Sequence, residues 1–377
     1  MKILGIETSC DETAAAVVLD GREILSNVVV SQIDIFAEYG GVIPEVAARS
    51  HLEAMMPVVN KALSEAKCGW DEIDAIAVTH APGLLGSLLI GTLTARTLAV
   101  IHEKPLYAVH HLKSHVYANW LASDKASKLA SERALQAARP SLTLSDANFA
   151  CPSPSFPLLA LVVSGGHTQI LYMREHNHFE IIGTTHDDAV GECFDKVAKI
   201  LGLPYPGGPA IARAALNGDE KKYKLPHPNV QGLDFSFSGL KTAVLRAVQK
   251  ELGLPISHPS HDLKNHLSEQ QIADFAASFQ KTAVDILIEK IREALVMYPE
   301  VKTVALAGGV SANKKLREEM GKIFHGLGDG SVYFPAPSLS GDNGAMVGAA
   351  AFYEIQSGVE PTDPYKLNIY PRVSIEA

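Results

Sequence analysis

The sequence predicts an α/β fold of two lobes, each built on a mixed β-sheet, with a cleft between them. The main observation is an internal repeat: the apolar runs Lys2–Glu7 and 157–163 are each followed by a turn of small residues and a second apolar run. Each half therefore begins with a predicted β-hairpin. Later, the short runs 74–79 and Thr303–Ala307 each precede a glycine-containing turn and a helix, which is typical of α/β proteins. We expect the hairpin turns to point into the cleft.

The length of 377 residues suits two domains. We predict an N-terminal lobe over residues 1–121, an insertion and linker over 122–156, and a C-terminal lobe over 157–377. The insertion is rich in Ala, Ser and Pro, and we expect a helix at about 124–138 followed by a Pro/Ser-rich stretch. The last helix, at about 343–357, should pack back towards the N-terminal lobe.

Apolar periodicity and capping residues predict the helices. They are expected at 45–66, 83–102, 112–122, 191–201, 208–217, 238–252, 268–297, 313–326 and 343–356.

Composition narrows the functional classes. The formal net charge of −9 argues against binding nucleic acid over the whole surface, so an RNA partner needs a local basic patch or a helper subunit. The four cysteines are widely spaced without a C-x-x-C motif, which favours a reduced cytoplasmic protein. Glu7 interrupts the first apolar stretch, so we expect a first strand of the mature protein and not a secretion signal. Gly86, Gly91 and Arg96 interrupt the longest apolar run, so no membrane segment is expected.

The turn after the first predicted strand carries Ser9, Asp11 and Glu12. Backbone N–H groups in a turn of small residues can bind a phosphate, and the carboxylates can hold a metal, orient a ribose or accept a proton. A surface turn with solvated acids is the alternative.

The corresponding turn of the second half reads Val162-Val163-Ser164-Gly165-Gly166. Glycine lacks a Cβ atom and lets the backbone approach a phosphate closely. Because a plain hairpin turn needs only one glycine, the pair beside a serine favours contact with a ligand.

Three further residues are candidates for binding a nucleotide. Asn313 follows the glycine pair 308–309 and could bind a base or ribose, or only cap the next helix. Asp195 could accept hydrogen bonds from ribose hydroxyls, or it could pair with Lys199 one helical turn later. Gly208 begins another helix with free N–H groups.

His111 and His115 are spaced i, i+4, which places both imidazoles on one face of a helix. Asp342, before the last predicted helix, is the best third ligand, although it could instead cap that helix. A His/His/Asp set suits Fe(II), Zn or Mn. The residues between the histidines include no glutamate, so the H-E-x-x-H pattern of metallopeptidases is absent.

Taken together, these segments resemble the TsaD (Gcp) family of tRNA N6-adenosine threonylcarbamoyltransferases, over essentially the whole chain except the insertion and the C-terminal tail. The resembling segments are 5–13 (GIETSCDET), 39–51, 82–88, 110–115 (HHLKSH), 161–169 (LVVSGGHTQ), 191–209, 233–242, 307–313 (AGGVSAN) and 341–346 (GDNGAM). The resemblance implies the actin/hexokinase/Hsp70 (ASKHA) fold. Ala212 departs from the family pattern, where many relatives carry a polar ligand contact.

The resemblance also implies an acyltransferase that moves the threonylcarbamoyl group of threonylcarbamoyl-AMP to N6 of adenosine 37 in tRNAs that read ANN codons. One divalent metal, most often iron with Zn or Mg as alternatives, is implied at His111, His115 and Asp342. The residues implied to contact the adenylate are Val162, Val163, Ser164, Gly165, Gly166, Asp195, Gly208 and Asn313. The partners implied are tRNA with TsaB-like and TsaE-like proteins in bacteria, or KEOPS subunits in archaea and eukaryotes.

For the catalytic step, our candidates are Glu12, Asp11 and Ser9, with one carboxylate assisting loss of the N6 proton. Three alternatives stand beside this interpretation: a metallopeptidase, the old sialoglycoprotein-endopeptidase label of the family; a sugar kinase of the same fold; and a non-catalytic scaffold. The absent H-E-x-x-H motif speaks against the first. A metal held by histidines is unexpected in the second, and the histidine pair is unexpected in a TsaB-like scaffold.

Overall fold

The structure is a computed structural model that describes residues 1–122, 153–228, 230–325 and 328–376. The helix expected at 124–138 and the linker cysteine, Cys151, lie outside the described residues. Within those residues, no helix is both long enough and apolar enough to span a membrane.

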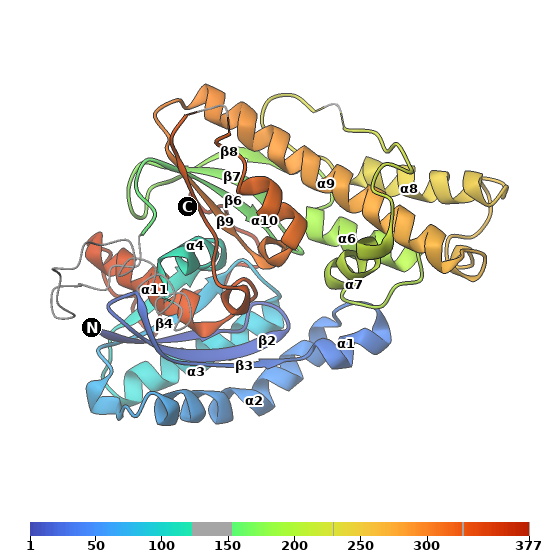
Figure 1. The fold of residues 1–377 in the computed structure, drawn as a ribbon. Coiled ribbons are helices and arrows are strands. Elements are labelled where there is room, and N and C mark those ends of the chain that lie inside the picture. The colour runs from blue at the N-terminus through green and yellow to red at the C-terminus, as the bar shows by residue number, and fades with distance from the viewer. Residues whose placement is uncertain (123–152, 229, 326–327, 377) are drawn as a thin grey trace, which may run out of the picture.

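Two five-stranded sheets form the two halves of the molecule (Figure 1). The N-terminal sheet has the order β3-β2-β1-β4-β5, and the C-terminal sheet has the order β10-β9-β6-β7-β8. In each half the first strand, β1 or β6, pairs antiparallel with its hairpin partner and parallel with a later strand. The predicted duplication of a mixed sheet is therefore confirmed. The strands are β1 (Lys2–Glu7), β2 (Glu12–Leu19), β3 (Glu23–Ser31), β4 (Ala75–Ala81), β5 (Leu106–His110), β6 (Leu158–Val163), β7 (Thr168–Met173), β8 (Phe179–Thr184), β9 (Thr303–Ala307) and β10 (Ser331–Tyr333).

Every predicted helix within the described residues has a counterpart. The helix expected at 313–326 is shorter than predicted, because it gives way to turns at Gly321, a residue with low helix propensity. The helices are α1 (Ile33–Tyr39), α2 (Pro44–Glu65), α3 (Leu85–Ile101), α4 (His111–Tyr117), α6 (Val190–Ile200), α7 (Gly207–Ala214), α8 (Ser238–Glu251), α9 (Glu269–Met297), α10 (Lys314–Met320) and α11 (Gly344–Gln356).

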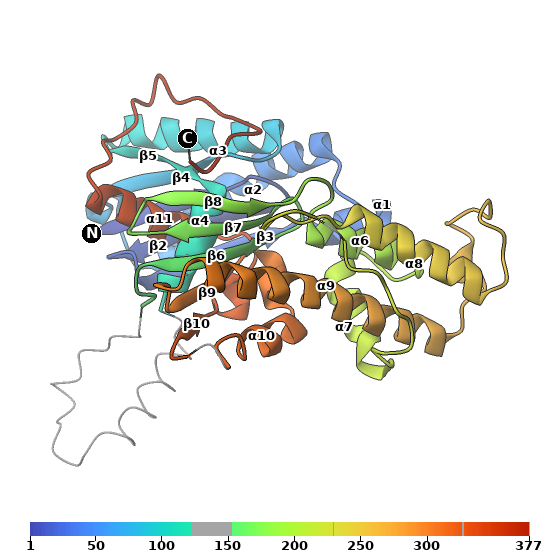
Figure 2. The same cartoon turned by 90° about the horizontal axis from the view of Figure 1, so that it is seen from above.

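The helices and sheets lie in layers with three hydrophobic cores between them. Helices α2 and α3 cover the outer face of the N-terminal sheet, and α6, α8 and α9 cover the outer face of the C-terminal sheet (Figure 1). Helices α4 and α11 pack between the inner faces of the two sheets. The chain after α11 returns along the N-terminal half (Figure 2), where Thr362 N donates to Leu106 O and Tyr370 N donates to His80 O.

The contact between β1 and α11 sets the position of the site. Side chains alternate along a strand, so Leu4 and Ile6 face α2 and α3, while Ile3, Gly5 and Glu7 face the middle layer. A Cβ atom on Gly5 would lie 2.2 Å from Gly344 O and 2.6 Å from the backbone N of Gly348. The two backbones are therefore in direct contact, which holds the start of α11 beside the end of β1.

We expect Gly5→Ala to lower the free energy of unfolding by about 3 kcal/mol, because the new methyl group meets backbone atoms that cannot move aside. Urea unfolding measures this change. Gly69→Ala is the control: its Cβ would meet no described atom within 4 Å, its φ is −82°, and it should change stability by less than about 0.5 kcal/mol. Equal unfolding midpoints for the two variants would contradict the close packing.

Candidate active site

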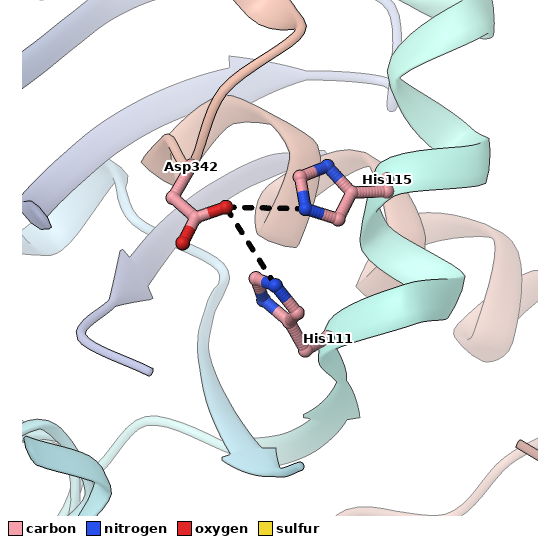
Figure 3. Close-up of side chains that lie close together, drawn as sticks. All are labelled: His111, His115 and Asp342. Carbon is pink, nitrogen blue, oxygen red and sulfur yellow. Dashed lines mark ion pairs between the residues drawn. The ribbon is translucent and has the colours of Figure 1, made fainter. Parts of the chain in front are cut away.

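Two histidines of α4 and one aspartate before α11 come together in the middle layer (Figure 3). The Asp342 Oδ1 atom lies 3.1 Å from His115 Nε2 and 3.6 Å from His111 Nε2. One ligand atom from each residue lies within 4.8 Å of the others. Both histidines are buried, and Asp342 is partly buried. Two imidazole nitrogens and a carboxylate oxygen at these distances fit a divalent first-row metal ion.

Asp342 does not cap α11. The cap is Asn343, whose side-chain oxygen accepts a hydrogen bond from Met346 N at 3.0 Å and whose amide donates to Gly341 O at 2.8 Å. The capping alternative for Asp342 is therefore wrong, and its carboxylate faces the two histidines.

The electrostatics of the cluster favour a cation. Burial alone would raise the pKa of Asp342, but the charges of His111 and His115 lower it to about 2. Burial alone would lower the pKa of His111, but Asp342 and Glu7 raise it to about 9. The same negative charge that holds a proton on His111 would attract a metal ion in place of that proton.

Glu7 supports the cluster from behind, a role that the sequence analysis missed. Its side chain is fully buried at the end of β1, with Oε2 3.2 Å from His111 Nδ1. Thr79 Oγ1 donates to the same oxygen at 2.6 Å, and Ser9 N donates to Oε1 at 2.5 Å. A histidine that donates its Nδ1 proton to a carboxylate presents Nε2 as the ligand atom. The alternation of side chains along the strand could have predicted this position, because it places Glu7 on the same face as Gly5.

The N-terminal turn lies beside the metal ligands, as the placement of Ser9, Asp11 and Glu12 shows. Ser9 is buried, and its Oγ lies 3.2 Å from His111 Nδ1. Burial, together with the negative charges of Asp342 and Asp11, raises the pKa of Glu12 to about 10. Its Oε1 accepts a hydrogen bond from Ser31 Oγ at 3.3 Å. This turn therefore gathers carboxylates next to Asp342.

Hydrogen bonds within the glycine-rich turn of the C-terminal half close the turn, and the space around its two glycines is open. Ser164 N donates to His167 O at 2.9 Å, and His167 N donates to Ser164 Oγ at 3.1 Å. A Cβ atom on Gly165 or Gly166 would meet no described atom within 4 Å. The side chains of Val162 and Val163 are buried in the two cores on either side of the sheet. A ligand here would therefore meet backbone groups of the turn.

His167, which the sequence analysis gave no role, lies near the metal ligands. Burial and the charges of His111 and His115 lower its pKa to about 4. His167 is therefore neutral at pH 7 and adds no positive charge to the glycine-rich turn.

Asp195 on α6 faces the start of α7 instead of Lys199. Its Oδ1 accepts a hydrogen bond from Gly207 N at 2.7 Å, and within the described part of the chain it forms no ion pair with Lys199. Burial raises its pKa, and the charge of Asp11 adds to that shift. The N-terminal turn and the start of α7 therefore lie within electrostatic reach across the two halves. Next to Gly207, a Cβ atom on Gly208 would meet no described atom within 4 Å.

Both polar atoms of the Asn313 side chain form hydrogen bonds within the protein. Its Oδ1 accepts a hydrogen bond from Leu316 N at 3.1 Å and so caps α10, while its Nδ2 donates to Gln280 Oε1 at 2.9 Å. The capping alternative is observed, and a ligand at this position would meet the side chain only after these bonds rearrange.

Comparison with known proteins identifies the family of this chain. The model of the TsaD family, described as tRNA N6-adenosine threonylcarbamoyltransferase, matches residues 23–131 and 142–349. A tRNA N6-adenosine threonylcarbamoyltransferase of Symbiobacterium thermophilum is 46% identical over 95% of this chain and 92% of its own length. One of Caldicellulosiruptor saccharolyticus is 43% identical over 100% of this chain and 98% of its own.

The fold also has a solved counterpart. HypF of T. kodakarensis superposes with a TM-score of 0.57 at 15% identity, over 94% of this chain and 48% of HypF. At this identity the likeness concerns the fold alone, and it supports the two-lobed ASKHA fold that the resemblance to the TsaD family implies. Because the family model spans most of the chain and the relatives align over nearly their whole length, this chain belongs to the TsaD family of tRNA N6-adenosine threonylcarbamoyltransferases.

Proposed function

We propose that this chain is the acyltransferase that moves the threonylcarbamoyl group of threonylcarbamoyl-AMP to N6 of adenosine 37 in ANN-decoding tRNAs, in the cytoplasm. This reaction is inferred from the family to which the chain belongs. The observation that supports a catalytic member most strongly is the cluster of His111, His115 and Asp342, beside two turns rich in small residues. Neither the metallopeptidase nor the sugar kinase alternative gains support from the relatives, which carry the transferase name.

His111, His115 and Asp342 would hold one divalent metal ion. We favour Fe²⁺, with Zn²⁺ next, because two imidazole ligands suit these ions better than Mg²⁺, which prefers oxygen ligands. When bound, such an ion supplies Lewis-acid stabilisation of negative charge on phosphate or carbonyl oxygens.

The AMP part of the donor would lie along the glycine-rich turns of the C-terminal half. The backbone N–H groups of Gly165 and Gly166 would bind its phosphate, since the N–H group of Ser164 donates to His167 O and the open side of this turn has room for a ligand. Asp195 would accept hydrogen bonds from the ribose, and Gly208, whose backbone N–H group also interacts with Asp195, would lie beside the ribose at the start of α7. Contact with Asn313 would require its side chain to give up its hydrogen bond with Leu316 or Gln280.

In the transfer, N6 of the adenosine attacks the carbonyl carbon of the threonylcarbamoyl group. The bond from that carbon to the phosphate oxygen breaks, AMP leaves, and N6 loses a proton. Asp11 would accept this proton, or Glu12 would do so once a bound cation lowers its raised pKa, because both lie in the N-terminal turn beside Asp342. Ser9 contacts His111 at 3.2 Å, so its contribution would be to position that imidazole.

A TsaB-like protein is the partner we propose, with a TsaE-like protein as the second, because the relatives named above are bacterial. The TsaB-like protein would dock on the outer surface of α2 and α3 of this chain. That surface exposes large apolar side chains, which a monomeric protein usually keeps apart or covers. They are Leu52, Met56, Leu85, Leu89 and Leu93.

The reaction can be tested with nucleoside mass spectrometry of tRNA incubated with the protein, threonine, bicarbonate, ATP and the bacterial partners. We expect the wild type to form threonylcarbamoyladenosine. His115→Ala should reduce the product at least about 100-fold, since loss of even an outer-shell partner often costs 10–100-fold. His178→Ala, an exposed histidine away from the cluster, should keep full activity. Absence of product with the wild type would refute the proposed function.

Glu7→Gln should weaken binding of ferrous iron by about 10-fold, because the neutral amide is a poorer partner for His111 Nδ1 than a carboxylate is. Titration against a colorimetric chelator, without any turnover, measures this affinity. Glu65→Gln, an exposed residue of α2, provides the matched control. An unchanged affinity in Glu7→Gln would show that Glu7 does not orient the ligand.

For the proton acceptor, we expect Glu12→Gln or Asp11→Asn to slow transfer from preformed threonylcarbamoyl-AMP by about 100-fold, the usual contribution of a general base. Single-turnover rates, with iron content measured in parallel, separate this loss from a loss of metal. If both variants transfer at nearly the wild-type rate, neither carboxylate is the base.

A further inference from the structure

A second cluster of metal-binding side chains lies in the loop between α8 and α9. It consists of His258, Asp262 and His266. Figures 1 and 2 both place this loop at the end of the molecule remote from α4 and α11. The proposed transfer reaction uses none of these residues.

The geometry of this cluster converges on one oxygen atom. Asp262 Oδ2 lies 2.9 Å from His258 Nε2 and 3.0 Å from His266 Nε2. The two rings are 5.7 Å apart and nearly perpendicular, at 77°, so they do not stack. One ligand atom of each residue lies within 4.8 Å of the others. Ligands of a tetrahedral ion sit about 2.0–2.2 Å from it, so a small shift of the two rings suffices for all three to share one ion.

The loop holds these side chains in place from several sides. Asp262 Oδ1 accepts a hydrogen bond from Asn265 Nδ2 at 2.9 Å, which fixes the plane of the carboxylate. The buried Gln249 of α8 donates from Nε2 to His258 O at 3.1 Å. Leu263 next to Asp262 is fully buried in the core of the C-terminal half. Hydrogen bonds and packing around the ligating residues orient the ligands of a metal site in this way.

The charge of the cluster suits a cation as well. Hydrogen bonds from Asn265, His266 and His258 lower the pKa of Asp262 to about 2, so its carboxylate is ionised at neutral pH. A divalent ion held by this cluster would compensate the charge of the carboxylate.

We propose that His258, Asp262 and His266 form a second metal site, separate from the site of the transfer reaction, which binds a divalent transition-metal ion. The nitrogen and oxygen donors favour Zn²⁺. All three residues are partly open to solvent, so water completes the coordination. The ion would link the middle of the loop that joins α8 to α9 with the part of the loop just before α9. The alternative is a surface network in which one carboxylate simply accepts hydrogen bonds from two histidines.

Counting bound ions distinguishes the two cases. After equilibrium dialysis of the full-length protein against buffered Zn²⁺, elemental analysis should find two ions per wild-type chain and one in His258→Ala/His266→Ala. That variant should still form threonylcarbamoyladenosine at the wild-type rate. His115→Ala should also retain one ion, which shows that the two sites fill independently. If the double variant binds as much zinc as the wild type, the proposal is overturned.

Two further variants guard against trivial explanations. Asp262→Asn keeps the shape of the side chain and should weaken zinc binding at this site at least about tenfold. His261→Ala removes a histidine from the same loop that is not in the cluster, and it should keep both ions. Equal loss of zinc in His261→Ala and in His258→Ala/His266→Ala would mean that a histidine-rich loop binds the ion without the proposed geometry, which also overturns the proposal.

Discussion

The contact of two backbones, β1 and α11, determines the rest of this structure. Gly5 and Gly344 come from opposite ends of the chain, and neither could carry a side chain without a clash. Their contact brings Asp342, two residues before α11, to the end of β1. There it meets the two histidines of α4, which lies in the same middle layer. The candidate active site thus depends on close packing between elements that are remote in the sequence.

The second constraint is electrostatic. Glu7 and Asp342 lie beside the buried His111, and Glu12 lies within electrostatic reach of Asp342. Like charges so arranged repel one another unless a proton or a cation intervenes. Proton uptake by His111 and Glu12 is one solution, and a bound divalent ion is the other. The layer between the two sheets therefore favours positive charge, which the proposed metal ion would supply.

Several parts of this account could be predicted from residues alone. The duplicated hairpins follow from the small-residue turns after Lys2–Glu7 and 157–163, and the histidine pair follows from helical spacing. The third strand of each half, β3 and β8, could not be predicted, because both are partly exposed and mix polar with apolar residues. Asp342 was ambiguous because an aspartate before a helix usually caps it. Only the structure shows that Asn343 takes that role.

Glu7 shows a different limit. A glutamate at the end of an apolar strand is buried only when polar groups from other elements meet it, and here Thr79, Ser9 and His111 do so. No local sequence pattern predicts those partners, because they come from β4, from the turn after β1 and from α4. The division of the chain at 121 and 156 stays a prediction, since the residues between lie mostly outside the described structure.

The central claim is that one cation binds to two imidazoles and one carboxylate between the sheets. Anomalous diffraction from crystals of the full-length protein grown with ferrous iron tests this claim directly. We predict one iron peak about 2.0–2.3 Å from His111 Nε2, His115 Nε2 and an Asp342 oxygen. An iron-loaded crystal with no peak at this place, or with the three side chains turned away from a common point, would contradict the account.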